Sequence, residues 1–64
     1  MSQALDNQLR RIKQHLDTAA DYAQRAKRSA NSDDSDSASR SIRNAADEIE
    51  RALTLVRRMR RDLP

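Results

Sequence analysis

Two unbroken series of apolar residues constrain this chain more than any other feature of its sequence. In each series the spacing alternates between four and three residues, which is the heptad pattern of a helix that packs against another helix along one seam. The first series contains Leu5, Leu9, Ile12, Leu16, Ala19, Ala23, Ala26 and Ala30. The second contains Ala38, Ile42, Ala45, Ile49, Ala52, Val56, Met59 and Leu63. The pattern predicts an all-α chain with one helix over about 3–30 and another over about 37–62.

The segment between the two series is predicted to be a turn, because residues 31–37 are all Asn, Ser or Asp. Their short polar side chains bond to nearby backbone and favour turns and helix N-caps over helix interiors. The alternative is one continuous helix in a long coiled coil, but Ala30 and Ala38 are eight residues apart, which breaks the heptad phase. We therefore expect a single antiparallel hairpin domain over 1–64, with a polar turn over about 31–36. The expected cap of the second helix is Ser35, Asp36 or Ser37.

Folding the chain back at this turn gives a register in which paired residue numbers add up to 68. Ala30 then meets Ala38 and Ile12 meets Val56, so that every layer of the seam has an apolar residue on both sides. The layers near the turn contain mostly Ala, so we expect the helices to approach closely there and to splay towards the termini. The larger residues expected in the seam are Leu5, Leu9, Ile12, Leu16, Ile42, Ile49, Val56, Met59 and Leu63.

A lone hairpin of this composition is predicted to be marginally stable. Ordering a residue costs about 1.5 kcal/mol, and ten of the 23 apolar residues are Ala, which contribute little burial. Further apolar residues lie outside the expected seam, and they would widen the stripe enough for a second hairpin. We interpret them as an interface that forms a homodimeric four-helix bundle or binds a partner protein, the alternative being that they only cover the seam edges. They are Ala20, Ala46 and Leu53 on one flank and Tyr22 and Leu55 on the other.

The composition excludes several kinds of site. The chain has no Cys and no Gly, so it has no disulfide, thiol nucleophile or glycine-rich phosphate loop. His15 is the only side chain that ordinarily titrates near neutrality, and no carboxylate lies one turn away on its own helix. The acidic turn lacks the Gly and closing Glu of a calcium loop. We therefore expect a protein that is not an enzyme and has no metal, cofactor or small-molecule ligand.

Basic residues offer an alternative function. The net charge is +3, and 11 of the 13 basic residues are Arg. The expected hairpin brings seven cations to its open end, where they would contact nucleic-acid phosphates in a small regulator. Because Tyr22 is the single aromatic side chain and base stacking needs several, nucleic acid stays the second hypothesis behind self-association. The seven are Arg10, Arg11, Lys13, Arg57, Arg58, Arg60 and Arg61.

No membrane association is expected. No apolar run approaches the roughly 18 residues of a membrane span, and half of the seam is Ala where a surface-bound helix has bulky residues. The first four residues lack the basic and then apolar layout of a signal peptide. We therefore expect a cytoplasmic protein.

Overall fold

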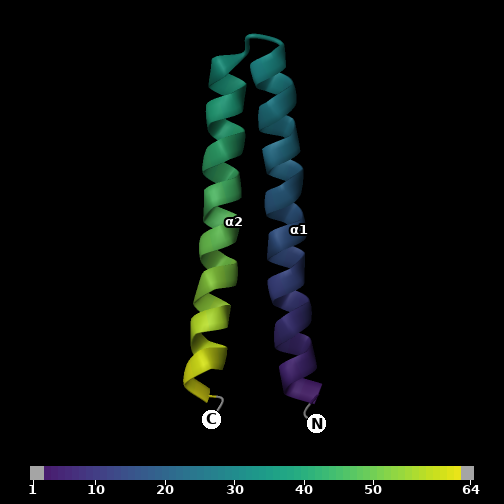
Figure 1. The fold of residues 1–64 in the computed structure, drawn as a ribbon, viewed down its shortest axis with the longest axis vertical. Helices are drawn as coiled ribbons and strands as arrows, with labels where there is room; N and C mark the ends of the chain where they lie inside the picture. Colours follow the sequence, from purple (N-terminus) through teal and green to yellow (C-terminus); the bar gives the residue numbers. More distant parts are fainter. Residues whose placement is uncertain (1–2, 63–64) are drawn as a thin grey trace.

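The computed structural model describes residues 3–62, and these form two α-helices. Helix α1 is Gln3–Asn31 and helix α2 is Ser35–Asp62. The helices lie side by side and antiparallel, and a short turn joins them at the end of the rod away from both termini (Figure 1). The rod measures 48 × 17 × 11 Å. The all-α hairpin expected from the heptad spacing is confirmed, and α1 ends one residue later and α2 begins two residues earlier than expected.

A Schellman motif ends α1. Asp33 has a φ angle of 58°, in the left-handed region that non-glycine residues seldom occupy. The Asp34 N–H donates to the Ser29 carbonyl oxygen at 2.8 Å, and the Asp33 N–H donates to the Ala30 carbonyl oxygen at 3.2 Å. These two bonds satisfy carbonyl groups that the end of a helix leaves free, and the motif reverses the chain in three residues, 32–34.

Asp34 caps α2. Its carboxylate accepts a hydrogen bond from the Ser37 N–H at 3.1 Å, which is the usual geometry of an N-cap residue and the third residue of its helix. The prediction of a cap at Ser35, Asp36 or Ser37 is therefore wrong. Because Asp33 adopts the left-handed conformation, the turn is shorter than expected and α2 begins directly after Asp34.

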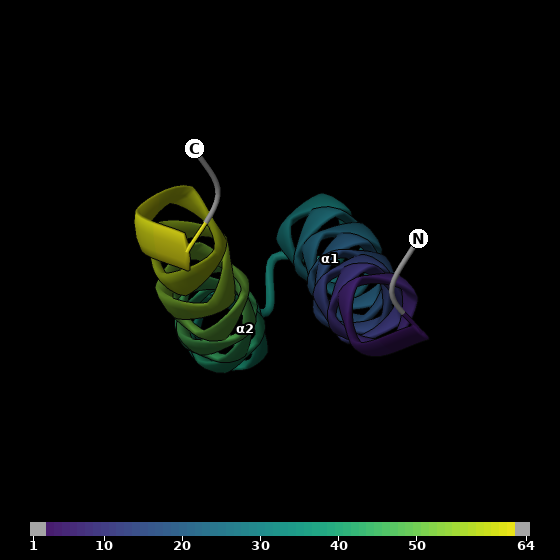
Figure 2. The same ribbon diagram turned by 90° about the horizontal axis from the view of Figure 1, so that it is seen from below.

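The seam between the helices is thin and consists largely of Ala. Figure 1 shows that α1 and α2 lie closest near the turn and move apart towards the termini, as the distribution of small and large residues predicts. At the open end Ile12 and Leu55 are buried with Ala52, and Val56 and Met59 pack against them. Seen along the rod, each helix has the other on one side only (Figure 2). The buried apolar residues are Ile12, Ala19, Ala26, Ala38, Ala45, Ala52 and Leu55.

Six of the predicted seam positions are exposed because the helices are rotated relative to the expected arrangement. In α1 the expected column of Leu9, Leu16, Ala23 and Ala30 is exposed, and the buried or half-buried column is one residue earlier, at Gln8, His15, Tyr22 and Ser29. In α2 Ile42 and Ile49 are likewise exposed, and the seam uses Ser41, Glu48 and Leu55. The predicted positions Leu5, Ile12, Val56 and Met59 are buried or half-buried, and Leu63 lies outside the described residues.

Polar contacts between the helices accompany this rotation and a shift in register. The Ser29 hydroxyl donates to the Ser37 hydroxyl at 3.0 Å, and His15 Nδ1 donates to Glu48 Oε2 at 2.6 Å. Ile12, expected to pair with Val56, is buried with Ala52 and Leu55, and Val56 packs against this cluster. Near the turn the register differs from the expected one, since Ser29 contacts Ser37 where Ser39 is expected opposite it. The register differs because the short connection places the first turn of α2 directly beside the last turn of α1.

Candidate interaction surface

Five large apolar side chains remain exposed on the hairpin. Leu9 is 50% exposed, Leu16 48%, Ile42 60%, Ile49 51% and Leu53 42%. Large apolar side chains that gather on one side of a small protein are typical of an interaction site, whereas singly scattered ones are ordinary surface. We call Leu9, Leu16, Ile42, Ile49 and Leu53 the apolar face.

The rotation of the helices places all five residues on the same side of the hairpin. Each of them directly follows a seam residue in the sequence: Leu16 follows His15, for example, and Ile49 follows Glu48. One step along a helix turns the side chain by about 100°, and because the helices are antiparallel, this step leads to the same side of the pair on both. Ala30 of α1 and Ile42 of α2 accordingly line one shallow hollow near the turn.

The predicted interface residues divide between this face and the seam. Leu53 belongs to the apolar face, and Ala20 and Ala46 are exposed and also directly follow seam residues. Tyr22 and Leu55 do not form a second outer flank, which corrects the prediction. Tyr22 is half-buried in the seam and Leu55 is only 8% exposed, because the rotation of the helices turns both towards the opposite helix.

A hydrogen-bonded polar cluster crosses the seam, and the sequence pattern did not reveal it. Glu48 accepts a hydrogen bond from His15 on the other helix and one from Arg51 Nη1, at 2.8 Å, on its own helix. The hydrogen bond from His15 lowers the pKa of the Glu48 carboxyl, burial opposes this effect, and the charges of Arg51 and His15 add to it. A signal was present, since His15 and Tyr22 lie in a seven-residue repeat one position ahead of the apolar column. The cluster joins the two helices where neither Ala nor Leu fills the seam.

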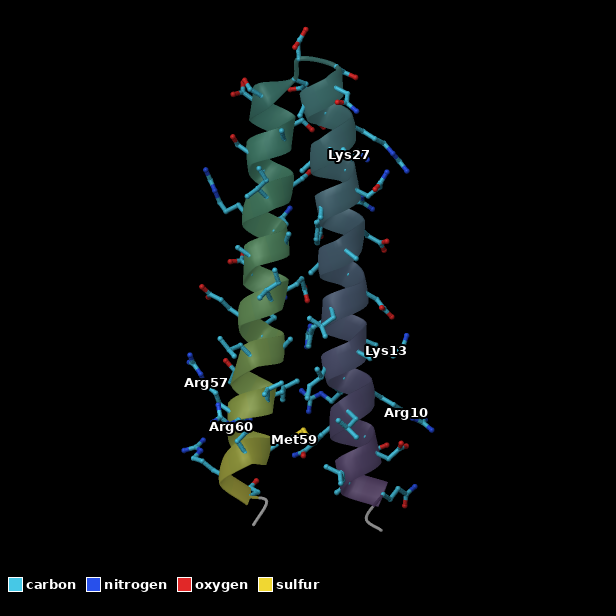
Figure 3. The ribbon with its side chains drawn as sticks, in the orientation of Figure 1. Arg10, Lys13, Lys27, Arg57, Met59 and Arg60 are labelled. Carbon is cyan, nitrogen blue, oxygen red and sulfur yellow. The ribbon has the colours of Figure 1, made fainter. Side chains whose placement is uncertain are left out.

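The cations predicted to gather at the open end lie on different sides of the rod. Arg10 pairs with Asp6 at 3.0 Å and Lys13 pairs with Asp17 at 2.8 Å, both on the outer side of α1. Figure 3 shows Arg57 and Arg60 on the opposite outer side, along α2, and Met59 between the helices. A hollow on α2 alone is lined by Arg57, Arg58, Arg60 and Arg61, together with Thr54.

The structure does bring two of the predicted cations together across the helices. Arg11 of α1 and Arg58 of α2 line one hollow with His15 and Arg51. Both residues directly precede seam residues, so this hollow is on the side of the hairpin opposite the apolar face. Basic residues therefore gather in two places, on the outer side of α2 and in this hollow between the helices.

No other kind of site is evident in the described part of the chain. Within residues 3–62 no three His, Cys, Asp or Glu side chains are arranged to hold a metal ion. Neither α1 nor α2 contains a stretch that is both long and apolar enough to cross a membrane. Comparison with protein-family models, curated proteins and solved structures finds no match to this chain.

Proposed function

We propose that the protein is a non-enzymatic assembly module whose apolar face binds a second copy of the chain to form a four-helix bundle. The exposure of five large apolar residues on one side of a helical hairpin is the observation that supports this proposal. Burying such faces against each other is the simplest way in which two hairpins complete one core. The cytoplasmic location expected from the sequence is part of the proposal.

The thin seam also supports the proposal, because one hairpin alone has a small core that a second hairpin would enlarge. Five of the seven buried apolar residues are Ala, and no large side chain between residues 3 and 62 is fully buried. Most of the Leu and Ile that a helical core requires are instead on the apolar face. A two-layer arrangement would bury these residues on both hairpins at once.

Charge supports a second copy as the partner. The open end carries seven basic residues against Asp6, Asp17 and Asp62, whereas the turn carries Asp33, Asp34 and Asp36. If two hairpins pack with their turns at opposite ends, each basic open end lies beside Asp33, Asp34 and Asp36 of the other copy, while Arg25, Arg28 and Arg40 near the turn lie on the side away from the apolar face. A two-fold axis through the apolar faces produces this arrangement from identical chains, because the same surface serves on both.

A single substitution on the apolar face tests the proposal. Leu53→Asp places a charge where the second copy packs, and we expect the chain to sediment as a monomer. The matched control is Thr54→Asp, which places the same charge at the neighbouring exposed position and should leave the dimer intact. An unchanged mass for Leu53→Asp would show that the apolar face is not the interface.

A further inference from the structure

The side of the hairpin opposite the apolar face carries six arginines along the line where the helices meet. They lie in two hollows, one towards the open end and one towards the turn. Each of the six directly precedes a seam residue in the sequence, which places all of them on this side. We call them the basic face: Arg11, Arg25, Arg28, Arg40, Arg51 and Arg58.

The hollow towards the turn has the composition of a phosphate site. Arg25, Arg28 and Arg40 line it together with Ser37, Ser41 and Asn44. Guanidinium groups bind phosphate oxygens in pairs of parallel hydrogen bonds, and hydroxyl and amide groups supply further donors. The Ser37 hydroxyl accepts the bond from Ser29, which leaves its own proton available to a ligand.

The arginine side chains of this hollow are not neutralised by the protein. Within residues 3–62 Arg25, Arg28 and Arg40 have no acidic partner, and the Arg25 guanidinium lies 5.3 Å from the centre of the Tyr22 ring. This cation–π contact holds Arg25 in place and leaves its outer edge free to donate. The charge of the hollow is therefore available to an anion.

The second hollow repeats this chemistry further along the rod. Arg11 and Arg58 have no acidic partner among residues 3–62, and Arg51 pairs with Glu48. Asp47 and Glu50 line a neighbouring hollow with Arg51, so the stretch between the two basic hollows is less positive. From Arg11 to Arg25 is 14 residues, or about 21 Å of helix, which corresponds to about six nucleotides at the axial rise of about 3.4 Å per nucleotide of a stacked strand.

We propose that the basic face binds the phosphate backbone of a nucleic acid, with the two hollows holding phosphates at separate points of one strand. A small anion reaches only one hollow, whereas a polyphosphate backbone reaches both. A membrane surface also attracts cations, but its binding needs exposed bulky apolar residues beside them, and here Tyr22 and Leu55 are held in the seam. Arg rather than Lys also favours phosphate over a diffuse acidic surface. In the proposed dimer the two basic faces stay exposed on opposite sides of the bundle.

The test compares two triple variants that remove the same charge. The first variant removes three positive charges from the hollow near the turn and is Arg25→Gln/Arg28→Gln/Arg40→Gln. The second removes three positive charges from the outer side of α2 and is Arg57→Gln/Arg60→Gln/Arg61→Gln. Binding of a fluorescent mixed-sequence RNA and of the matching single- and double-stranded DNA is measured by anisotropy over a range of salt concentrations. We expect the first variant to bind about tenfold more weakly or worse and to lower the salt slope by about 2 to 3, and the second to stay within about threefold.

Each other outcome overturns the proposal. No salt-dependent binding by the unsubstituted protein would eliminate a nucleic-acid ligand. An equal loss in both variants would mean that net charge alone attracts the oligonucleotide, and a larger loss in the second would move the site to α2. Displacement of the oligonucleotide by polyglutamate or anionic vesicles at equal charge concentration would identify an acidic protein or a lipid surface as the partner. Circular dichroism of both variants verifies that the hairpin is intact.

Discussion

Truncating Ile49 to Ala has different consequences for a dimeric and a monomeric hairpin. The change removes three carbon groups, and at about 0.8 kcal/mol each their full burial contributes about 2.4 kcal/mol. Ile49 is 51% exposed in the hairpin, so about half of this, roughly 1.2 kcal/mol, depends on a second copy. If the dissociated hairpins stay folded, the substitution removes about 2.4 kcal/mol of intermolecular burial from the two copies of a dimer. This loss raises the dissociation constant about 50-fold.

Helix propensity acts in the opposite direction. Ala stabilises an exposed helical position by up to about 0.5 kcal/mol relative to Ile. If the helices melt when the dimer dissociates, the substitution removes the full burial of Ile49 in two copies, about 4.8 kcal/mol; the propensity gain offsets about 1 kcal/mol and leaves about a 500-fold weakening. In a hairpin that is always monomeric the burial lost within the hairpin, about 1.2 kcal/mol, exceeds the propensity gain, so the substitution lowers its stability by about 0.7 kcal/mol and leaves its mass unchanged.

Analytical ultracentrifugation of the two proteins at several concentrations measures the dissociation constants. The control is Glu50→Ala, which truncates the next, exposed side chain on the outer side of α2 and should leave the dissociation constant within about threefold. The reasoning is refuted if Ile49→Ala leaves association unchanged, or if it raises the thermal midpoint at every concentration.

Three further predictions concern the hairpin itself. Asp33→Gly should raise the free energy of unfolding in urea by about 0.5 to 1 kcal/mol, since Gly adopts the left-handed conformation of this position without a steric penalty; a loss of stability would contradict the role of the turn. Because the pKa of Glu48 is lowered in the fold, its contribution is complete above its ordinary value of 4.5 and is lost as pH falls through the lowered value. The stability advantage of the native chain over Glu48→Gln, measured by urea unfolding, should therefore shrink in acid, and an advantage that grows in acid would show the reverse linkage. Leu55→Ala should cost about 2 to 4 kcal/mol, since this side chain is buried beside Ile12, and a thermal midpoint unchanged by the substitution would remove Leu55 from the seam.

The heptad spacing predicted the elements of the fold but not their rotation. Both helices, the place of the turn and the splay towards the termini follow from the apolar series and the polar segment between them. The spacing does not decide which two columns of a wide apolar stripe face the partner helix. Leu16 and Ile49 belong to the most apolar columns, yet the seam uses the neighbouring column with His15 and Glu48.

The rotation of the helices results from the conformation of the turn, which the heptad spacing does not predict. The left-handed Asp33 and the capping Asp34 shorten the turn, and the shorter turn fixes how α2 lies against α1. Contacts that cross the seam depend on this geometry, and so the bond between His15 and Glu48 was not predicted. The exposure of Leu53 is predictable because this residue lies outside the heptad series, whereas the burial of Leu55 is not, because it depends on the rotation.

Sedimentation equilibrium over a wide concentration range, with helicity recorded on the same samples, tests self-association most directly. We expect a species near twice the chain mass of 7.3 kDa that loses helicity as dilution dissociates it. A mass of one chain at every concentration, with helicity that does not change on dilution, would contradict it.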